Sequence, residues 1–134
     1  MAALAEAERM EREKALMEGQ RRVDMLRETV RVLANRQTAL VGAQRRLKIS
    51  TEELQRLSPD HCVYESVGRV FLRISVPALI EKQMEHAERC EAEEKKLSAE
   101  KQRIAEQLRK DEVELREAAQ LYVAEMNARQ AGRQ

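Results

Sequence analysis

Two long stretches of the sequence carry hydrophobic residues at alternating intervals of three and four positions. In the first stretch, two interleaved rows each repeat every seven residues, which places an apolar stripe on one side of a helix where a second helix can pack. The pattern predicts a helix over about residues 3–48. The members of the two rows are Leu16, Val23 and Val30, and Leu26, Leu33, Leu40 and Leu47.

The second stretch contains neither glycine nor proline from Ala78 to Ala131. Its hydrophobic rows predict a helix over about residues 77–129, with Ser75 as its N-cap and Pro77 in the first turn, where a missing N–H is harmless. The rows comprise Ile80, Ala87, Leu108, Leu115 and Tyr122, and Cys90, Leu97, Ile104 and Ala118; the polar residues Glu94, Lys101 and Asp111 interrupt them.

Charge favours pairing of the first helix with the second. Residues 20–48 contain eight basic and two acidic side chains, whereas residues 81–117 contain nine basic and twelve acidic ones. Flanking charges of opposite sign help to select coiled-coil partners, although each exposed pair contributes little. The sequence therefore predicts a long antiparallel two-helix coiled coil.

The centre of the chain follows a different pattern. Residues 51–57 begin with hydroxyl and acidic side chains and predict a short helix, which Pro59 would end. Residues 61–75 are rich in β-branched and aromatic residues and alternate in their second half, which predicts a β-hairpin that reverses at Gly68. Because an isolated two-stranded hairpin is marginal in water, we expect it to pair with strands of other chains.

The composition agrees with a mainly α chain that has little interior of its own. Of 134 residues, 37% are charged and only 2% are aromatic, which indicates one domain over residues 1–134 that completes its burial in an oligomer. A net charge of +1 argues against a nucleic-acid partner and a membrane surface. The acidic N-terminus is not typical of a signal peptide.

No residue pattern indicates an enzyme or a cofactor site. The histidines, His61 and His86, have no partner at ligand spacing, and we interpret both as solvated surface residues. Cys62 and Cys90 form no CxxC motif, so we expect no metal, no disulfide framework and a reducing compartment. There is no Gly-rich phosphate loop and no nucleophile motif.

The string VYESVGRVFL at residues 63–72, between two long helices, resembles the β-class subunits of the prefoldin family. Among these subunits the string is most similar to that of subunit 1, as is the preceding STEELQRL at residues 50–57. Val76-Pro77-Ala78 and Cys62 depart from the subunit 1 pattern, the former towards subunit 2. The specific similarity covers the centre alone, since many coiled coils share the heptads of the helices.

The resemblance implies a cytoplasmic subunit of a hexamer of two α-class and four β-class subunits, joined through their hairpins. Such a complex captures unfolded clients, such as actin and tubulin, at its coiled-coil tips and delivers them to the cytosolic group II chaperonin, without nucleotide hydrolysis or a cofactor. The implied assembly residues are Val63, Tyr64, Val67, Gly68, Arg69, Val70, Phe71, Leu72 and Ile74. The implied client-binding residues near the two chain ends are Leu4, Met10, Met17, Leu121, Val123 and Met126.

Three alternatives stay open at this point. The methionines near the chain ends could be ordinary seam residues, because methionine also fills gaps in packed helices. The chain could be a structural coiled-coil adaptor, although an adaptor has no need of a hairpin between its helices. It could also be a subunit of a prefoldin-like co-chaperone complex.

Overall fold

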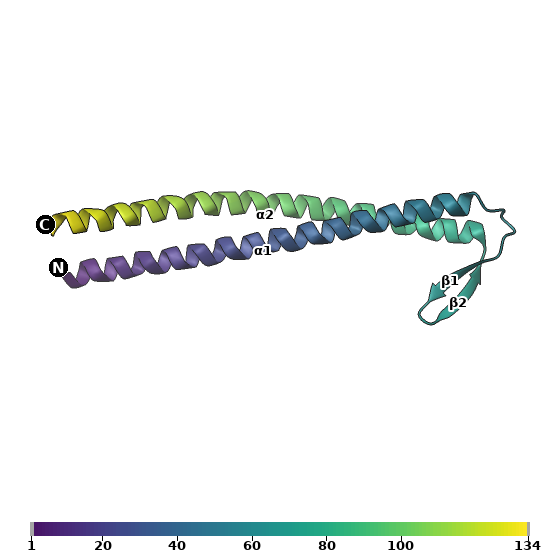
Figure 1. Ribbon diagram of the computed structural model, residues 1–134, viewed down its shortest axis with the longest axis horizontal. Helices are drawn as coiled ribbons and strands as arrows, with labels where there is room; N and C mark the ends of the chain where they lie inside the picture. The colour runs from purple at the N-terminus through teal and green to yellow at the C-terminus, as the bar shows by residue number, and fades with distance from the viewer. Residues whose placement is uncertain (1, 134) are drawn as a thin grey trace. The chain divides into compact units, whose positions relative to one another are not determined.

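The computed structural model describes residues 2–133, except for the side chains of Ala2 and Leu4. The chain forms a helix, α1 (Ala2–Gln55), two strands, β1 (Val63–Val67) and β2 (Val70–Ile74), and a second helix, α2 (Val76–Gly132) (Figure 1). The strands pair antiparallel as a two-stranded sheet. The predicted fold, two long helices with a central β-hairpin, is confirmed.

The predicted break in α1 at residues 49–50 is wrong. The helix continues to Gln55, so residues 51–57 do not form a separate helix. The side chains that resembled an N-cap instead contact α2: the Ser50 hydroxyl accepts a hydrogen bond from Gln83 Nε2 at 2.9 Å, and the Thr51 hydroxyl donates to Gln83 Oε1 at 3.0 Å. Without a glycine or proline between residues 43 and 58, nothing in the sequence ends the helix earlier.

The start of α2 agrees with the predicted cap. The Ser75 hydroxyl accepts a hydrogen bond from the N–H of Ala78 at 3.3 Å, which satisfies one of the free donors of the first turn. The first residue of the helix, Val76, is buried. The helix runs three residues beyond the predicted end at 129.

The chain forms two compact units. The first, here called the terminal unit, comprises Met1–Leu33 and Glu100–Gln134. Its segments of α1 and α2 pack antiparallel, with Val23 only 1% exposed. Gly19 lets the helices approach closely here, since a Cβ atom added to it would lie 3.1 Å from Leu115 Cδ1.

The second unit, here called the hairpin unit, comprises Ala34–Ala99. Its segments of α1 and α2 are also antiparallel, and polar contacts from Arg36 to Glu93 (2.6 Å) and from Gln37 to Glu94 (3.0 Å) join them. The carboxylate of Glu94, which interrupts the seam, therefore accepts a hydrogen bond from an amide on the other helix. The buried side chains of this unit are Leu54, Val76, Cys90 and Leu97.

The predicted seam rows are mostly correct. Every member in α1 is buried or half-buried, and so is every member in α2 except Ala118, which is exposed while its neighbour Ala119 is half-buried. Within the described residues only six hydrophobic side chains are buried, and of these only Val23 is fully buried, so the seam is shallow. A shallow seam agrees with the low aromatic content, because large rings supply much of the buried area of a globular core.

We expect Leu97→Ala to lower the free energy of unfolding of the isolated chain by about 2–3 kcal/mol, because truncating a buried leucine loses transfer energy and leaves a cavity. Leu97 is 5% exposed. The matched control is Met84→Ala, since Met84 on the same helix is 53% exposed and its truncation should change stability by less than about 0.5 kcal/mol. Urea denaturation followed by circular dichroism measures the free energy of unfolding of both variants. Equal losses of stability would contradict the placement of Leu97 in the seam.

Candidate assembly and client-binding surfaces

The hairpin reverses through a two-residue loop, Gly68-Arg69, closed by the pair Val67 and Val70. Gly68 has a φ of 61°, whereas Arg69, like every other non-glycine residue of the described chain, has a negative φ. A loop with glycine at a positive φ in its first position and a negative φ in its second is a type II′ turn, whose twist matches that of the strands. The prediction that Gly68 makes the reversal is confirmed.

The register of the strands divides their side chains between two faces, because residues directly opposite each other point to the same side. One face is apolar apart from Glu65, and the other combines two aromatic rings with a serine and an arginine. The first face comprises Val63, Glu65, Val67, Val70, Leu72 and Ile74, and the second comprises Tyr64, Ser66, Phe71 and Arg73.

Both faces of the hairpin are open along most of their length. Phe71, the only phenylalanine of the chain, is 71% exposed, and Tyr64, Val67, Val70 and Leu72 are also exposed. Only Val63, Glu65 and Ile74 are half-buried. A small sheet with apolar side chains open on both faces has the character of an interface, because contiguous apolar surface is costly to leave in water.

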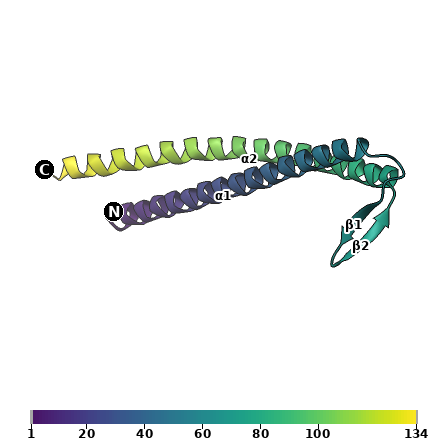
Figure 2. The ribbon, with the colours of Figure 1, turned by 45° about the vertical axis from the view of Figure 1, so that its right-hand side comes forward.

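An ion pair joins β1 of the hairpin to α2. Lys82 Nζ of α2 donates to Glu65 Oε2 at 3.0 Å. A cleft of about 720 Å³ lies between β1 and α2, with Tyr64, Glu65 and Ser66 on one side and Lys82 and His86 among the residues on the other. No residue of β2 lines this cleft. Figures 1 and 2 agree that β2 lies on the side of β1 away from the helices.

The terminal unit contains the predicted client-binding residues. Met10 and Met17 of α1 are exposed, as are Leu121 and Val123 of α2, whereas Met126 is half-buried. The side chain of Leu4 lies outside the described part of the structure. Exposure argues against the interpretation of Met10 and Met17 as seam residues.

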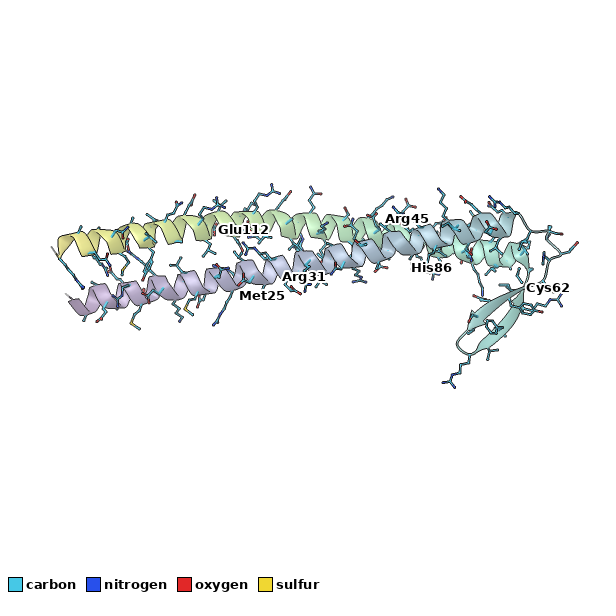
Figure 3. All side chains as sticks on the ribbon, in the orientation of Figure 1. Met25, Arg31, Arg45, Cys62, His86 and Glu112 are labelled. Carbon is cyan, nitrogen blue, oxygen red and sulfur yellow. The ribbon has the colours of Figure 1, made fainter. Side chains whose placement is uncertain are left out.

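Sequence reasoning missed two exposed residues in the same unit, Met25 and Val32. Together with Met10 and Met17 they recur after seven, eight and seven residues, intervals that fall on either side of two helical turns, so all four lie on one side of α1. Figure 3 shows Met25, which is 71% exposed, on the side of α1 away from α2. The signal was present in the sequence, but it lies outside the heptad rows. We call Met10, Met17, Met25 and Val32 the outer stripe.

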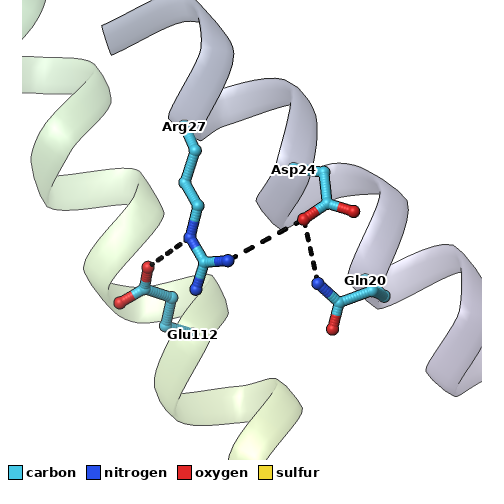
Figure 4. Close-up of polar contacts among 4 residues, drawn as sticks. All are labelled: Gln20, Asp24, Arg27 and Glu112. Carbon is cyan, nitrogen blue, oxygen red and sulfur yellow. Dashed lines mark hydrogen bonds and ion pairs between the residues drawn. The ribbon is translucent and has the colours of Figure 1, made fainter. Parts of the chain in front are cut away.

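Polar contacts join the two helices of the terminal unit beside its seam. Arg27 Nε donates to Glu112 Oε1 at 3.2 Å, and the same arginine lies 3.8 Å from Asp24 (Figure 4). Arg12 pairs with Glu125. Exposed pairs of this kind contribute little to stability and hold the helices weakly.

Tyr122 packs half-buried in the seam and donates a hydrogen bond from its hydroxyl to Glu13 Oε1. That hydrogen bond favours the protonated phenol and so raises the pKa of Tyr122 above its ordinary value. Its contact with α1 agrees with the sequence-based interpretation of this residue as a packing residue.

The His, Cys, Asp and Glu side chains of residues 2–133 are not clustered as metal ligands. No group of three or more His, Cys, Asp or Glu side chains among them is placed to hold a metal ion. Cys62 is exposed and Cys90 is buried, and both are free thiols. Over the same residues, neither helix has a stretch apolar and long enough to cross a bilayer.

Comparisons with known proteins agree with this geometry. The sequence family described as "Prefoldin subunit" matches residues 17–121. The crystal structure of the prefoldin beta subunit from Thermococcus strain KS-1 superposes with a TM-score of 0.69 at 14% identity, covering 78% of this chain and 91% of that one. No curated protein sequence matches the chain.

Proposed function

The chain belongs to the prefoldin subunit family, and from that premise we propose that it is a β-class subunit of a hetero-hexameric, ATP-independent holdase. The family is one of chaperones, so the chain is a prefoldin-type chaperone subunit. The observation that supports the finer statement is the hairpin, whose apolar side chains are exposed on both faces. The subunit 1 branch, suggested by the string at residues 63–72, is part of the same proposal.

In this proposal, residues 1–134 act as one domain with two surfaces. The hairpin joins α-class and other β-class subunits, and the helix ends of the terminal unit hold unfolded clients of the actin and tubulin kind. Methionine suits the second role, because its flexible, polarizable side chain adapts to many partners. Weak contacts made many times over would hold a client by avidity and pass it to the cytosolic group II chaperonin. The family match across both units supports a single domain.

The experiment that tests assembly is affinity capture of the tagged chain from cytosol, followed by native mass spectrometry. We expect a particle of about six times the 15.5 kDa chain mass, composed of several small subunits of the same family. A homodimer, or a complex with one large folded protein, would instead favour the coiled-coil adaptor. A partner set of transcription-linked proteins would favour a prefoldin-like co-chaperone complex.

We expect removal of residues 1–12 and 122–134 to leave the complex assembled and to weaken client capture, because the cuts spare the hairpin unit and remove the exposed side chains of Met10 and Val123. Native mass measures assembly, and light scattering of a denatured protein diluted into buffer measures capture. Unchanged suppression of aggregation by the truncated complex would place the client site elsewhere.

A further inference from the structure

The methionines of the chain lie outside both the heptad rows and the hairpin. Five of the six are in the described residues, and three of these, Met10, Met17 and Met25, belong to the outer stripe. Neither heptad row contains a methionine, and residues 61–75 contain none either. A reaction specific to the methionine thioether would therefore change the outer stripe and leave the heptad rows and the hairpin chemically unchanged.

The three methionines of the outer stripe are open to small reagents in solution. Met10 is 63% exposed, Met17 is 60% exposed and Met25, on the side of α1 away from α2, is 71% exposed (Figure 3). Two other methionines provide comparisons within the same chain. Met84 is also exposed but lies in the hairpin unit, whereas Met126 lies in the terminal unit and is half-buried.

We propose that Met10, Met17 and Met25 form an oxidation-sensitive site, through which hydrogen peroxide stops client capture by this subunit. The lone pair of each thioether sulfur attacks one oxygen of the peroxide, so that an S–O bond forms and the O–O bond breaks. The hydroxide that leaves takes the proton of the transferred oxygen and becomes water. The sulfur is oxidised by two electrons to a sulfoxide, and the peroxide is reduced by the same two electrons.

The sulfoxide opposes client capture because it replaces a flexible apolar side chain with a polar one. A client that binds through many weak apolar contacts loses three of them at once, while the seam that joins α1 to α2 keeps its leucine and valine side chains. The change is reversible, since methionine sulfoxide reductases return the oxygen as water while two thiols become a disulfide. The inference rests on the proposed function, because it names a chemical control of the client-binding surface.

The first measurement is the rate of sulfoxide formation at each methionine, followed by mass spectrometry of proteolytic peptides. All chains carry Cys62→Ser, because Cys62 is an exposed thiol that peroxide would also oxidise, whereas Cys90 is buried. We expect Met84 and the stripe methionines to react about threefold faster than Met126, since the oxidant must reach the sulfur. Stripe methionines that react no faster than Met126 would overturn the site.

The second measurement is client capture after oxidation. The chain is treated with hydrogen peroxide, the oxidant is destroyed with catalase, and the complex is reconstituted with untreated partner subunits. We expect the concentration of complex that halves the aggregation of a denatured protein to rise about fivefold. Native mass should be that of the untreated complex apart from the added oxygen atoms, and circular dichroism should show the same helix content.

A variant without thioethers in the outer stripe identifies the responsible residues. The triple variant Met10→Leu, Met17→Leu and Met25→Leu keeps the apolar surface and the helix, because leucine matches methionine in volume and helix propensity. It should capture clients equally well before and after peroxide. Met84→Leu is the matched control, which should lose capture on oxidation as the unmodified chain does.

The outcomes separate this inference from the proposed function. Full capture by the oxidised complex, an equal loss in the triple variant, or a loss that accompanies disassembly would each overturn the oxidation-sensitive site. Capture that stays low after a methionine sulfoxide reductase has removed the added oxygen would overturn it as well. Absence of capture by the untreated complex would instead overturn the proposed function, so the two failures are distinguishable.

Discussion

Replacing Gly68 by valine should leave the helices intact and prevent the chain from entering its complex. Gly68 has a φ of 61°, a region in which an L-residue costs about 1–2 kcal/mol, and the cost is greater for a β-branched side chain. No atom lies within 4 Å of a Cβ added there, so the effect comes from the backbone alone. Since a two-stranded hairpin is marginal on its own, this cost is enough to melt it.

The measurement is native mass of the complex reconstituted with Gly68→Val, with helix content followed by circular dichroism. The matched control is Gly42→Ala in α1, where the added methyl makes only an ordinary contact with Arg46 and the helix gains up to about 1 kcal/mol. The control should assemble normally and unfold at a higher urea concentration. A fully assembled Gly68→Val complex would show that the turn does not govern assembly.

Changing the outer stripe to glutamine should weaken client capture about tenfold while assembly stays normal. The variant combines Met10→Gln, Met17→Gln, Met25→Gln and Val32→Gln. Glutamine forms helices as well as methionine does, so the helix is kept and the apolar contact surface is removed. If each side chain loses about 1 kcal/mol of burial against a client, the combined effect is large even after partial compensation by neighbouring sites.

The quantity measured is the concentration of complex that halves the aggregation of a denatured protein. A double variant, Ile49→Gln and Met84→Gln, provides the matched control, because both residues are exposed and apolar but lie in the hairpin unit. We expect the control to suppress aggregation normally. A stripe variant as active as the control would show that clients do not contact this side of α1.

The hairpin could be predicted to within two residues at its start and one at its end, because its signals are local. The strands are predicted by side chains that alternate over a few positions, and the turn is predicted by a single glycine. Gly68 indeed has the positive φ that the first position of this turn requires. The heptad rows were equally informative, because a period of seven over many residues leaves few other structures. The cap of α2 at Ser75 was a further local signal that is confirmed.

The errors arose where a contact on the other helix decided the structure. Ser50 and Thr51 resemble a helix start, yet both hydroxyls bond to Gln83, thirty-two or thirty-three residues away. Ala118 was placed in the seam by period alone, although the half-buried position is Ala119. Met25 and Val32 lie outside the heptad rows, and exposed apolar residues need not follow any such row, so the period of seven does not identify them. A local sequence pattern does not show which side chains of one helix will contact the other helix.

The small number of buried side chains affects how much of this chain a cell retains. Only six hydrophobic residues of the described chain are buried, so the gap in free energy between its folded and opened forms is small until partners add their own buried surface. Copies made in excess of their partners would open often and be removed by proteases, as marginally stable chains are. The abundance of this subunit would then follow the supply of its partner subunits, and degradation would keep their amounts in balance.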